Sequence, residues 1–415
     1  MRMVKGIWLA SVALFAMLSG GALPGVAVAA SCSEIAVGAV LSLTGRYSTA
    51  GVLTRDGYEF AIRQIRDAGG MRVGDKCYNL RVVYRDDESS PERGVLVALR
   101  LIEEDRVRFM LGPNSAAVAD AIADLTETAR IPMLTAQGMP RSSLAKGRKY
   151  LFGLLTASDQ HLAAGLEFAA KMVLDSDRSK ASVKIAVVSG KEPYMADLRR
   201  GLLQLAASQK LNVVVDEKLT DDFVNLPTIL SKVRQTKADV LLVAAHAKAV
   251  ARVAQQIEGM PAHLPIMAMT HCEAGNIATK ASDAASRILC AARKTETNLS
   301  PVGLLRDRAA FDKAFKGHFK AYAGRAIPDA AAQAALAVYV YADAFRRARS
   351  RDNEKVRAAL QDTRMSTFFG YLDFAEGGNA VAVPMVWRQI QGGKYRIVAP
   401  ADVATHQFQS PRSGL

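Results

Sequence analysis

Short apolar segments alternate with amphipathic helical segments along the first part of this 415-residue chain, and this alternation limits the fold more than any other feature. Residues 35–41 form a continuous apolar run, typical of a strand buried on both faces. A helix is predicted over 51–68, and Gly69 and Gly70 end it. Further strands are predicted at 80–84, 107–111 and 131–135, with helices at 92–105 and after Ser115. Repeated βα units of this length predict a parallel, doubly wound sheet.

The alternation restarts downstream and predicts a second α/β lobe that begins near residue 157. Its strands are predicted at 184–188, 212–215, 239–244 and 265–269, and its helices at 194–208, 226–236 and 248–258. Two long helices follow at 305–322 and 329–349 without strands of their own, so we expect them to pack on a lobe already formed. The C-terminal part of the chain is predicted to form a hairpin or short meander, with strands at 370–374, 381–390 and 395–398 and a turn at 377–379.

The first thirty residues have the pattern of a secretory signal peptide. Arg2 and Lys5 precede an apolar run over 7–18, and small residues follow at 26–31. A membrane anchor is the alternative, but the run is shorter than the roughly 18 to 20 residues needed to span a bilayer. We therefore expect residues 1–30 to be cleaved and the rest to be a soluble protein that works outside the cytoplasm.

Charge and motifs argue against two classes of function. The formal charge is +14, but the positive residues are scattered without a basic run, so nucleic acid is not an expected partner. The chain lacks GxSxG, P-loop, HExxH and strand-following GxGxxG motifs, and its six histidines do not cluster with carboxylates. We expect no catalysis, no cofactor and no metal.

Four cysteines lie beyond the predicted leader: Cys32, Cys77, Cys272 and Cys290. An even number in an oxidising compartment predicts disulfides, and the absence of CxxC spacing argues against zinc. They fall in the sequence as an early and a late pair, so we expect Cys32–Cys77 and Cys272–Cys290.

Ligands of parallel sheets bind at the carboxyl ends of the strands, so the loops at 42–50, 112–115, 135–141 and 189–194 are the candidate site. In the second loop, Gly112 allows close approach and Ser115 precedes a helix, whose N-terminus favours a carboxylate or phosphate. A plain helix cap explains Ser115 equally well.

Five segments in order resemble one family: 37–45, the "IRDAGG" of 65–70, the "YRDD" of 84–87 with Pro91, the "GPNS" of 112–115, and the "IPMLT" of 131–135. Together they resemble the leucine/isoleucine/valine-type periplasmic binding proteins of ABC importers. The likeness extends over about residues 35–398. It implies two parallel-sheet lobes joined by three crossings, the type I periplasmic-binding-protein fold.

The resemblance also implies domain boundaries and partners. Lobe 1 is expected at 33–155 plus 295–368, lobe 2 at 156–294 plus 369–400, and a C-terminal tail at 401–415. The crossings are expected near 154–156, 293–297 and 367–371. The implied partners are a small-molecule ligand and a membrane permease, with hinge closure of a monomer around the ligand.

Ligand contacts in lobe 1 are expected from three loops. Ser115 matches the serine of the family's ligand loop, next to Asn114. The next loop carries Gln137, Gly138 and Met139, where Met139 replaces a family threonine and adds apolar surface. Tyr47, beside Arg46, lies in the first loop.

In lobe 2, Tyr194 matches a family tyrosine, and His246 stands where the family has a second one. The acid that pairs with the ligand's ammonium falls on 270–273, so either Glu273 or His271 faces the ligand. Glu273 there favours an amino acid, whereas His271 suits a carboxylate without an amine.

The leading hypothesis is therefore import of a hydrophobic, branched-chain or aromatic, amino acid. A small organic carboxylate lacking an amine is the alternative ligand, and a ligand-sensing regulator of the same fold is a less favoured class. Residues 29–32 also form an imperfect lipobox, and a lipid on Cys32 would exclude its disulfide.

Overall fold

The computed structural model describes residues 32–137, 143, 146–154, 162–174, 179–257, 266–280, 288–293, 307–374 and 385–409. The expected leader, the turn at 377–379, Gly138 and Met139 lie outside these residues. No helix among them is long and apolar enough to cross a membrane.

The first sheet has six strands in the order β2-β3-β1-β4-β5-β6. They are β1 (Ser33–Leu41), β2 (Met71–Val73), β3 (Lys76–Asp86), β4 (Met110–Leu111), β5 (Met133–Thr135) and β6 (Leu151–Gly153). All neighbours are parallel except β2, which pairs antiparallel with β3 at the edge. The central β1 is buried on both faces, as its apolar run predicts.

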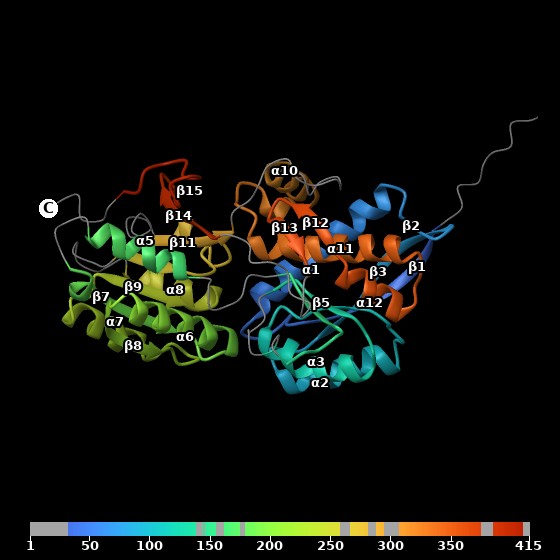
Figure 1. Cartoon of the computed structure of the whole chain (residues 1–415), viewed down its shortest axis with the longest axis horizontal. Helices are drawn as coiled ribbons and strands as arrows, with labels where there is room; N and C mark the ends of the chain where they lie inside the picture. The colour runs from blue at the N-terminus through green and yellow to red at the C-terminus, as the bar shows by residue number, and fades with distance from the viewer. Residues whose placement is uncertain are drawn as a thin grey trace, which may run out of the picture. The chain divides into compact units, whose positions relative to one another are not determined.

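Helices cover both faces of this sheet (Figure 1). On one face lie α1 (Ser48–Asp67), α10 (Arg308–His318), α11 (Asp329–Ala348) and α12 (Asn353–Gln361), whose apolar side chains share one core. On the other lie α2 (Pro91–Glu103) and α3 (Ala116–Thr128). The late helices thus pack on the first lobe, as expected. A short 3₁₀ turn, Lys320–Tyr322, replaces the end of the predicted helix 305–322.

The second sheet has seven strands in the order β15-β14-β11-β10-β9-β7-β8. They are β7 (Lys184–Ser189), β8 (Asn212–Lys218), β9 (Val240–Ala244), β10 (Ile266–Met269), β11 (Ile288–Arg293), β14 (Met385–Gln391) and β15 (Lys394–Ala399). Strands β7 to β11 run parallel, and β14 and β15 form the predicted antiparallel hairpin.

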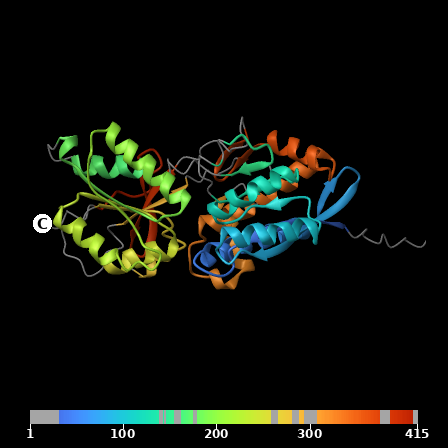
Figure 2. The ribbon, with the colours of Figure 1, turned by 90° about the horizontal axis from the view of Figure 1, so that it is seen from below.

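Figure 2 shows the helices on the two faces of this sheet. One core contains α5 (Ala163–Leu174) and α6 (Pro193–Ser208). The other contains α7 (Leu226–Gln235), α8 (Ala247–Ile257) and α9 (Ile277–Lys280). The fold is therefore the predicted pair of doubly wound lobes, with antiparallel strands added at the edges.

Two expected boundaries differ from the structure. Strands β12 (Arg364–Thr367) and β13 (Gly370–Asp373) form a hairpin, and Leu372 and Phe374 lie in the core of the first lobe. The third crossing therefore lies after Phe374 and not at 367–371. The expected tail begins as part of lobe 2, because the Gln389 side chain hydrogen-bonds the backbone of Gln409 and Phe408 packs on Phe168.

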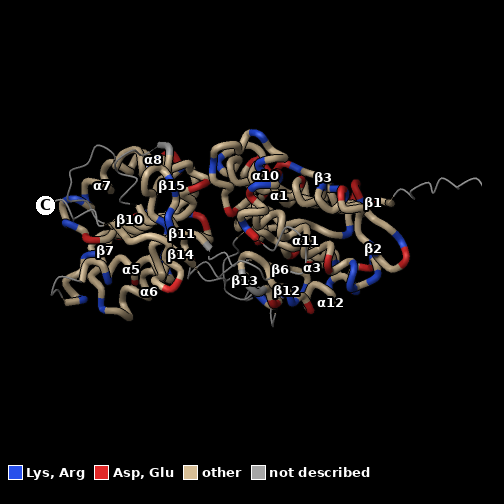
Figure 3. Tube along the Cα trace, turned by 90° about the horizontal axis from the view of Figure 1, so that it is seen from above, with Lys and Arg blue, Asp and Glu red and all other residues tan. Residues whose placement is uncertain are grey.

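Both expected disulfides are present. Cys32 bonds to Cys77 beside the paired strands β1 and β3, and Cys272, just after β10, bonds to Cys290 in β11. Figure 3 shows Lys and Arg interspersed with Asp and Glu along the chain, in agreement with a distributed positive charge.

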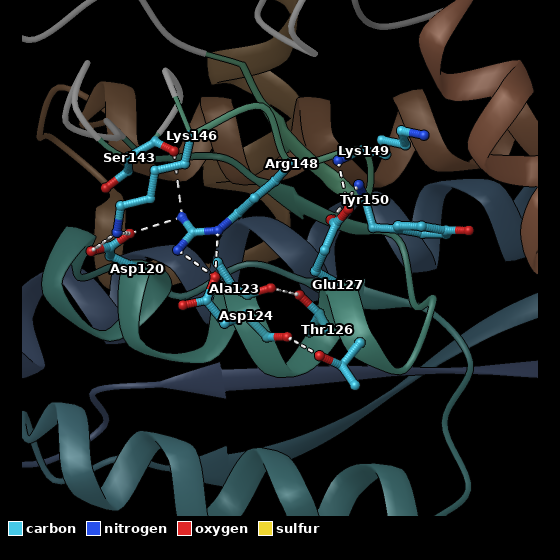
Figure 4. A network of polar contacts seen from close by, with 11 residues as sticks. Asp120, Ala123, Asp124, Thr126, Glu127, Ser143, Lys146, Arg148, Lys149 and Tyr150 are labelled. Atoms are coloured by element: carbon cyan, nitrogen blue, oxygen red, sulfur yellow. Dashed lines mark hydrogen bonds and ion pairs between the residues drawn. The ribbon is translucent and has the colours of Figure 1, made fainter.

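A network of charges fixes the segment before β6 to α3 (Figure 4). The Arg148 side chain, 5% exposed, reaches Asp120 at 2.9 Å and Asp124 at 2.8 Å. The backbone N–H groups of Lys149 and Tyr150 both donate to the Glu127 carboxylate at 2.9 Å. Helix α3 therefore holds the entry of β6, next to the loop that carries Gln137.

Candidate functional site

A cavity lies where the loops after the strands of both sheets meet. The space between the protein atoms there is about 1070 Å³, a value that includes open solvent, and the mixed polar and apolar lining is typical of a small-molecule site. Lobe 1 lines it with Arg46, Tyr47, Thr49, Ala50, Leu53, Asn114, Ala116, Gln137, Pro328, Asp329, Ala330 and Gln333. Lobe 2 lines it with Tyr194, His246, Ala247, Lys248, 271–274, Ala291, Ala292 and Met385.

Three rings form one wall of this cavity. The His246 ring lies 5.0 Å from that of Tyr47 and 5.3 Å from that of His271. Burial, and to a smaller extent the positive charge of Arg46, lower the pKa of His246 to about 4. His271 Nδ1 lies 3.1 Å from the Ala245 carbonyl, which only accepts, so Nδ1 carries the proton. The His246 ring is therefore uncharged at neutral pH.

Each carboxylate of the cavity wall has an arginine beside it. Glu273 hydrogen-bonds Arg388 of β14, and Asp329 lies 2.7 Å from Arg308. Burial raises the pKa of Glu273, and the charge of Arg388 opposes that rise. These pairs neutralise both acids, which leaves neither as a free counter-ion for a ligand ammonium.

Two buried amide donors at the cavity lack a protein partner within the described residues. Asn114 is 7% exposed; its Oδ1 accepts from the Ser42 N–H at 2.9 Å, whereas its Nδ2 has no partner. Gln333 is 3% exposed, and its Nε2 also has none. In contrast, Gln137 Nε2 donates to the Ala330 carbonyl at 3.3 Å.

Most of the predicted site residues converge on this cavity. Tyr47, Asn114, Gln137, Tyr194, His246, His271 and Glu273 all line it. Ser115 is not among the lining residues and acts as the cap of α3, accepting from the Val118 N–H at 3.5 Å. The plain-cap interpretation therefore fits Ser115 better than a ligand contact.

Sequence reasoning missed the contribution of α11. Asp329 and Gln333 lie one helical turn apart on this helix and both line the cavity. A signal was present, because Gln333 is the single polar residue in the otherwise apolar run 330–341, and a buried amide in such a run requires a partner. Lys248 and Met385 were also missed.

One short segment of lobe 1, residues 45–47, contacts lobe 2 at four points. Lys248 Nζ donates to the Gly45 carbonyl at 3.1 Å, and Arg46 lies 3.1 Å from Asp221. The Tyr47 hydroxyl donates to Glu192 at 3.3 Å, in addition to its ring contact with His246. This segment therefore borders the cavity and joins the two lobes.

The cavity offers hydrogen bonds and apolar walls but no centre for catalysis by a metal. No three His, Cys, Asp or Glu side chains converge into a metal-binding group in the part of the chain that the structure describes. The arrangement can hold a small solute by its polar head and enclose its apolar part.

Comparison with known proteins agrees with this architecture. A Leu/Ile/Val-binding protein from Rhizobium johnstonii is 25% identical over 273 residues, covering 61% of this chain and 69% of the relative. Leu/Ile/Val-binding protein homolog 3 of Brucella melitensis and homolog 8 of Brucella suis are each 22% identical and are matched over 54% of their length.

Solved structures share the fold. The leucine binding protein LivK of Thermotoga maritima aligns with a TM-score of 0.74 and 18% identity, covering 89% of this chain and all of that one. A solute binding protein of R. palustris in complex with benzoate aligns with a TM-score of 0.71 and 18% identity, covering 88% and 96%. The predicted type I fold is thereby confirmed.

The family model described as "Periplasmic binding protein" matches residues 34–394, nearly all of the described chain. This is a family of binding proteins and not of enzymes, and it implies a location outside the cytoplasm. The chain therefore belongs to the periplasmic binding protein family.

Proposed function

We propose that this protein is the solute-binding component of an ABC importer and that it binds a hydrophobic amino acid in the cavity between its lobes. The observation that supports this most is that one cavity combines aromatic and apolar walls with two amide donors that have no partner among the residues the structure describes. Tyr47, Tyr194 and His246, which line the cavity, contact the side chain of the ligand. The closed, loaded monomer then docks on a membrane permease.

A matched pair of ligands tests this assignment. Calorimetric titration compares leucine with 4-methylpentanoate, which keeps the carbon skeleton and carboxylate but lacks the amine. We expect one site per chain, with leucine binding at least tenfold more tightly. Equal or weaker binding of leucine would transfer the assignment to the second ligand class.

That second class, an aromatic or other small carboxylate without an amine, is favoured by one specific observation. Both acids of the cavity wall are paired with arginines, so a ligand ammonium meets no free carboxylate. The rings of His246 and His271, whose centroids lie 5.3 Å apart, suit a flat apolar ligand. Tight binding of benzoate or 3-phenylpropanoate with weak binding of phenylalanine identifies this class.

We further propose export through a cleaved signal peptide to the periplasm as a lipid-free protein. The disulfide of Cys32 supports this, because a sulfur bonded to Cys77 cannot carry a lipid. The mass of the mature chain tests it: we expect a chain starting near Ser31, whereas an added lipid of several hundred daltons would exclude the proposal.

A further inference from the structure

Gln333 occupies a place that ordinary packing does not explain. It lies in the buried face of α11, where its neighbours Ala331, Ala332, Ala334 and Ala335 are all fully buried. Its Nε2 has no partner within the described residues although the side chain is 3% exposed. Burial of an amide without a hydrogen bond destabilises a protein, so such a group indicates a partner that binds from outside.

A second donor lies on the same cavity. Asn114 follows β4, and its orientation is fixed because Oδ1 accepts from the Ser42 N–H. Its Nδ2 is therefore the free end, and it has no partner in the described part of the chain. The two donors come from elements that are more than two hundred residues apart in sequence, yet both line one space.

We infer that Gln333, together with Asn114, binds the acceptor oxygens of the ligand's head group and that Gln333 determines specificity for a carboxylate. This inference rests on the proposed binding function and adds a residue of α11 to the site. Two amide N–H groups match the two oxygens of a carboxylate, which accepts hydrogen bonds without donating any.

The test replaces Gln333 by methionine, which has a similar shape but no donor. Calorimetry uses leucine, 4-methylpentanoate and benzoate as probes. We expect at least tenfold weaker binding of whichever acid the wild-type protein binds. Gln333→Glu, which places a negative charge at the head group, should weaken it further. Unchanged affinity in Gln333→Met would overturn the inference and leave the proposed function intact.

The stability of the empty protein gives a readout that needs no ligand. Because the variant removes an unpartnered amide, Gln333→Met should raise the Tm of the ligand-free protein by about 1–3 °C. Gln389 is the matched control: it is equally buried, but its Nε2 donates to the Gln409 carbonyl at 2.7 Å. Gln389→Met should lower the Tm and leave binding unchanged.

The proposed binding function and the inference about Gln333 would be contradicted by different results. If the wild-type protein binds none of the probes, the assigned ligand class is wrong, and the Tm of Gln333→Met still decides the inference. A lower Tm, like that of Gln389→Met, would show that Gln333 has a structural role and would overturn it.

Discussion

At the scale of single residues, protonation in the cavity wall has a predictable effect on stability. The pKa of His246 falls to about 4 in the folded protein, so the folded state binds this proton less readily than the unfolded chain does. The stability that neutral His246 contributes is complete above pH 6.5 and is lost as the pH falls towards 4.

We therefore expect His246 to reduce the free energy of unfolding by up to about 2 kcal/mol between pH 7.5 and 5, from about 1.5 pH units at 1.36 kcal/mol each. This is an upper value, because the ring is partly exposed. Urea unfolding at both pH values measures it. His246→Gln should lose that part of the pH dependence, and an unchanged slope in the variant would contradict the assignment.

The contribution of Asp87 to stability changes with pH in the opposite direction to that of His246. It is fully buried, and burial raises its pKa to about 6. Its contribution to stability is complete below pH 4 and is lost as the pH rises through 6. Asp87→Asn keeps an oxygen for the Ser89 N–H, which donates to Asp87 Oδ1 at 2.7 Å.

We expect Asp87→Asn to be more stable than the wild-type protein at pH 7.5, by up to about 3 kcal/mol, and to match it at pH 4. Paired urea titrations at the two pH values measure the difference. A variant that is destabilised at pH 7.5 would show that the ionised carboxylate stabilises the fold.

At the scale of elements, α1 and α11 pack closely because Gly57 has no side chain. A Cβ there would lie 2.2 Å from the Ala331 carbonyl oxygen and 2.7 Å from the Ala334 Cβ. Gly57→Ala should therefore force the helices apart and cost more than about 2 kcal/mol of stability.

Gly317 in α10 is the matched control, because a Cβ there meets nothing within 4 Å. Gly317→Ala should stabilise the protein by about 0.5–1 kcal/mol through helix propensity. Thermal unfolding of both variants distinguishes close packing from a general effect of alanine. Similar Tm changes in the two would contradict the role given to Gly57.

The charge network on α3 allows a second comparison between neighbours. Arg148 is buried between Asp120 and Asp124, whereas Lys146 contacts Asp120 from a half-exposed position. Arg148→Ala should cost about 2 kcal/mol, and Lys146→Ala about 0.5 kcal/mol or less. Chemical denaturation of both variants checks this order, and a larger loss in Lys146→Ala would reverse it.

Strands with continuous apolar runs and helices with apolar residues at helical spacing, such as α2 and α7, could be predicted from the sequence, whereas several elements without such a pattern could not. Strand β9 is buried throughout, strand β1 is buried at all but one residue of the apolar run 35–41, and both were predicted. Strand β11 reads ILCAAR, in which half the run is small or charged, and it was missed. Helix α12 and strand β12 were also missed, because their packing on the first lobe, and not local pattern, stabilises them.

The candidate ligand site could likewise be predicted only where the local sequence pattern determines the position of a residue. Residues in the loops after the strands could be predicted, because the topology brings those loops together. Gln333 could not be placed, since its position at the cavity depends on how α11 returns to the first sheet. The choice between Glu273 and His271 depends on Arg388, which is 115 residues from Glu273 in sequence.

At the scale of the whole molecule, segment 45–47 should govern how long a ligand is retained. Tyr47 contacts Glu192 and His246 of the other lobe, so Tyr47→Ala removes contacts that favour closure. We expect about tenfold faster ligand release, measured by stopped-flow displacement. Tyr84→Phe, which removes a hydroxyl bonded to Glu59 within lobe 1, should leave release unchanged.

If Tyr47→Ala and Tyr84→Phe accelerated ligand release equally, the faster release would not be specific to the contacts between the lobes. A release rate that Tyr47→Ala leaves unchanged would remove segment 45–47 from the closing mechanism.

Native mass spectrometry of the freshly purified, disulfide-bonded chain tests the central claim most directly. The account predicts one small organic acid per chain, either co-purified or acquired from millimolar leucine, phenylalanine or benzoate, and a smaller bound fraction in Gln333→Met at the same ligand concentration. A bare chain under every one of these conditions would contradict a solute-binding cavity between the lobes.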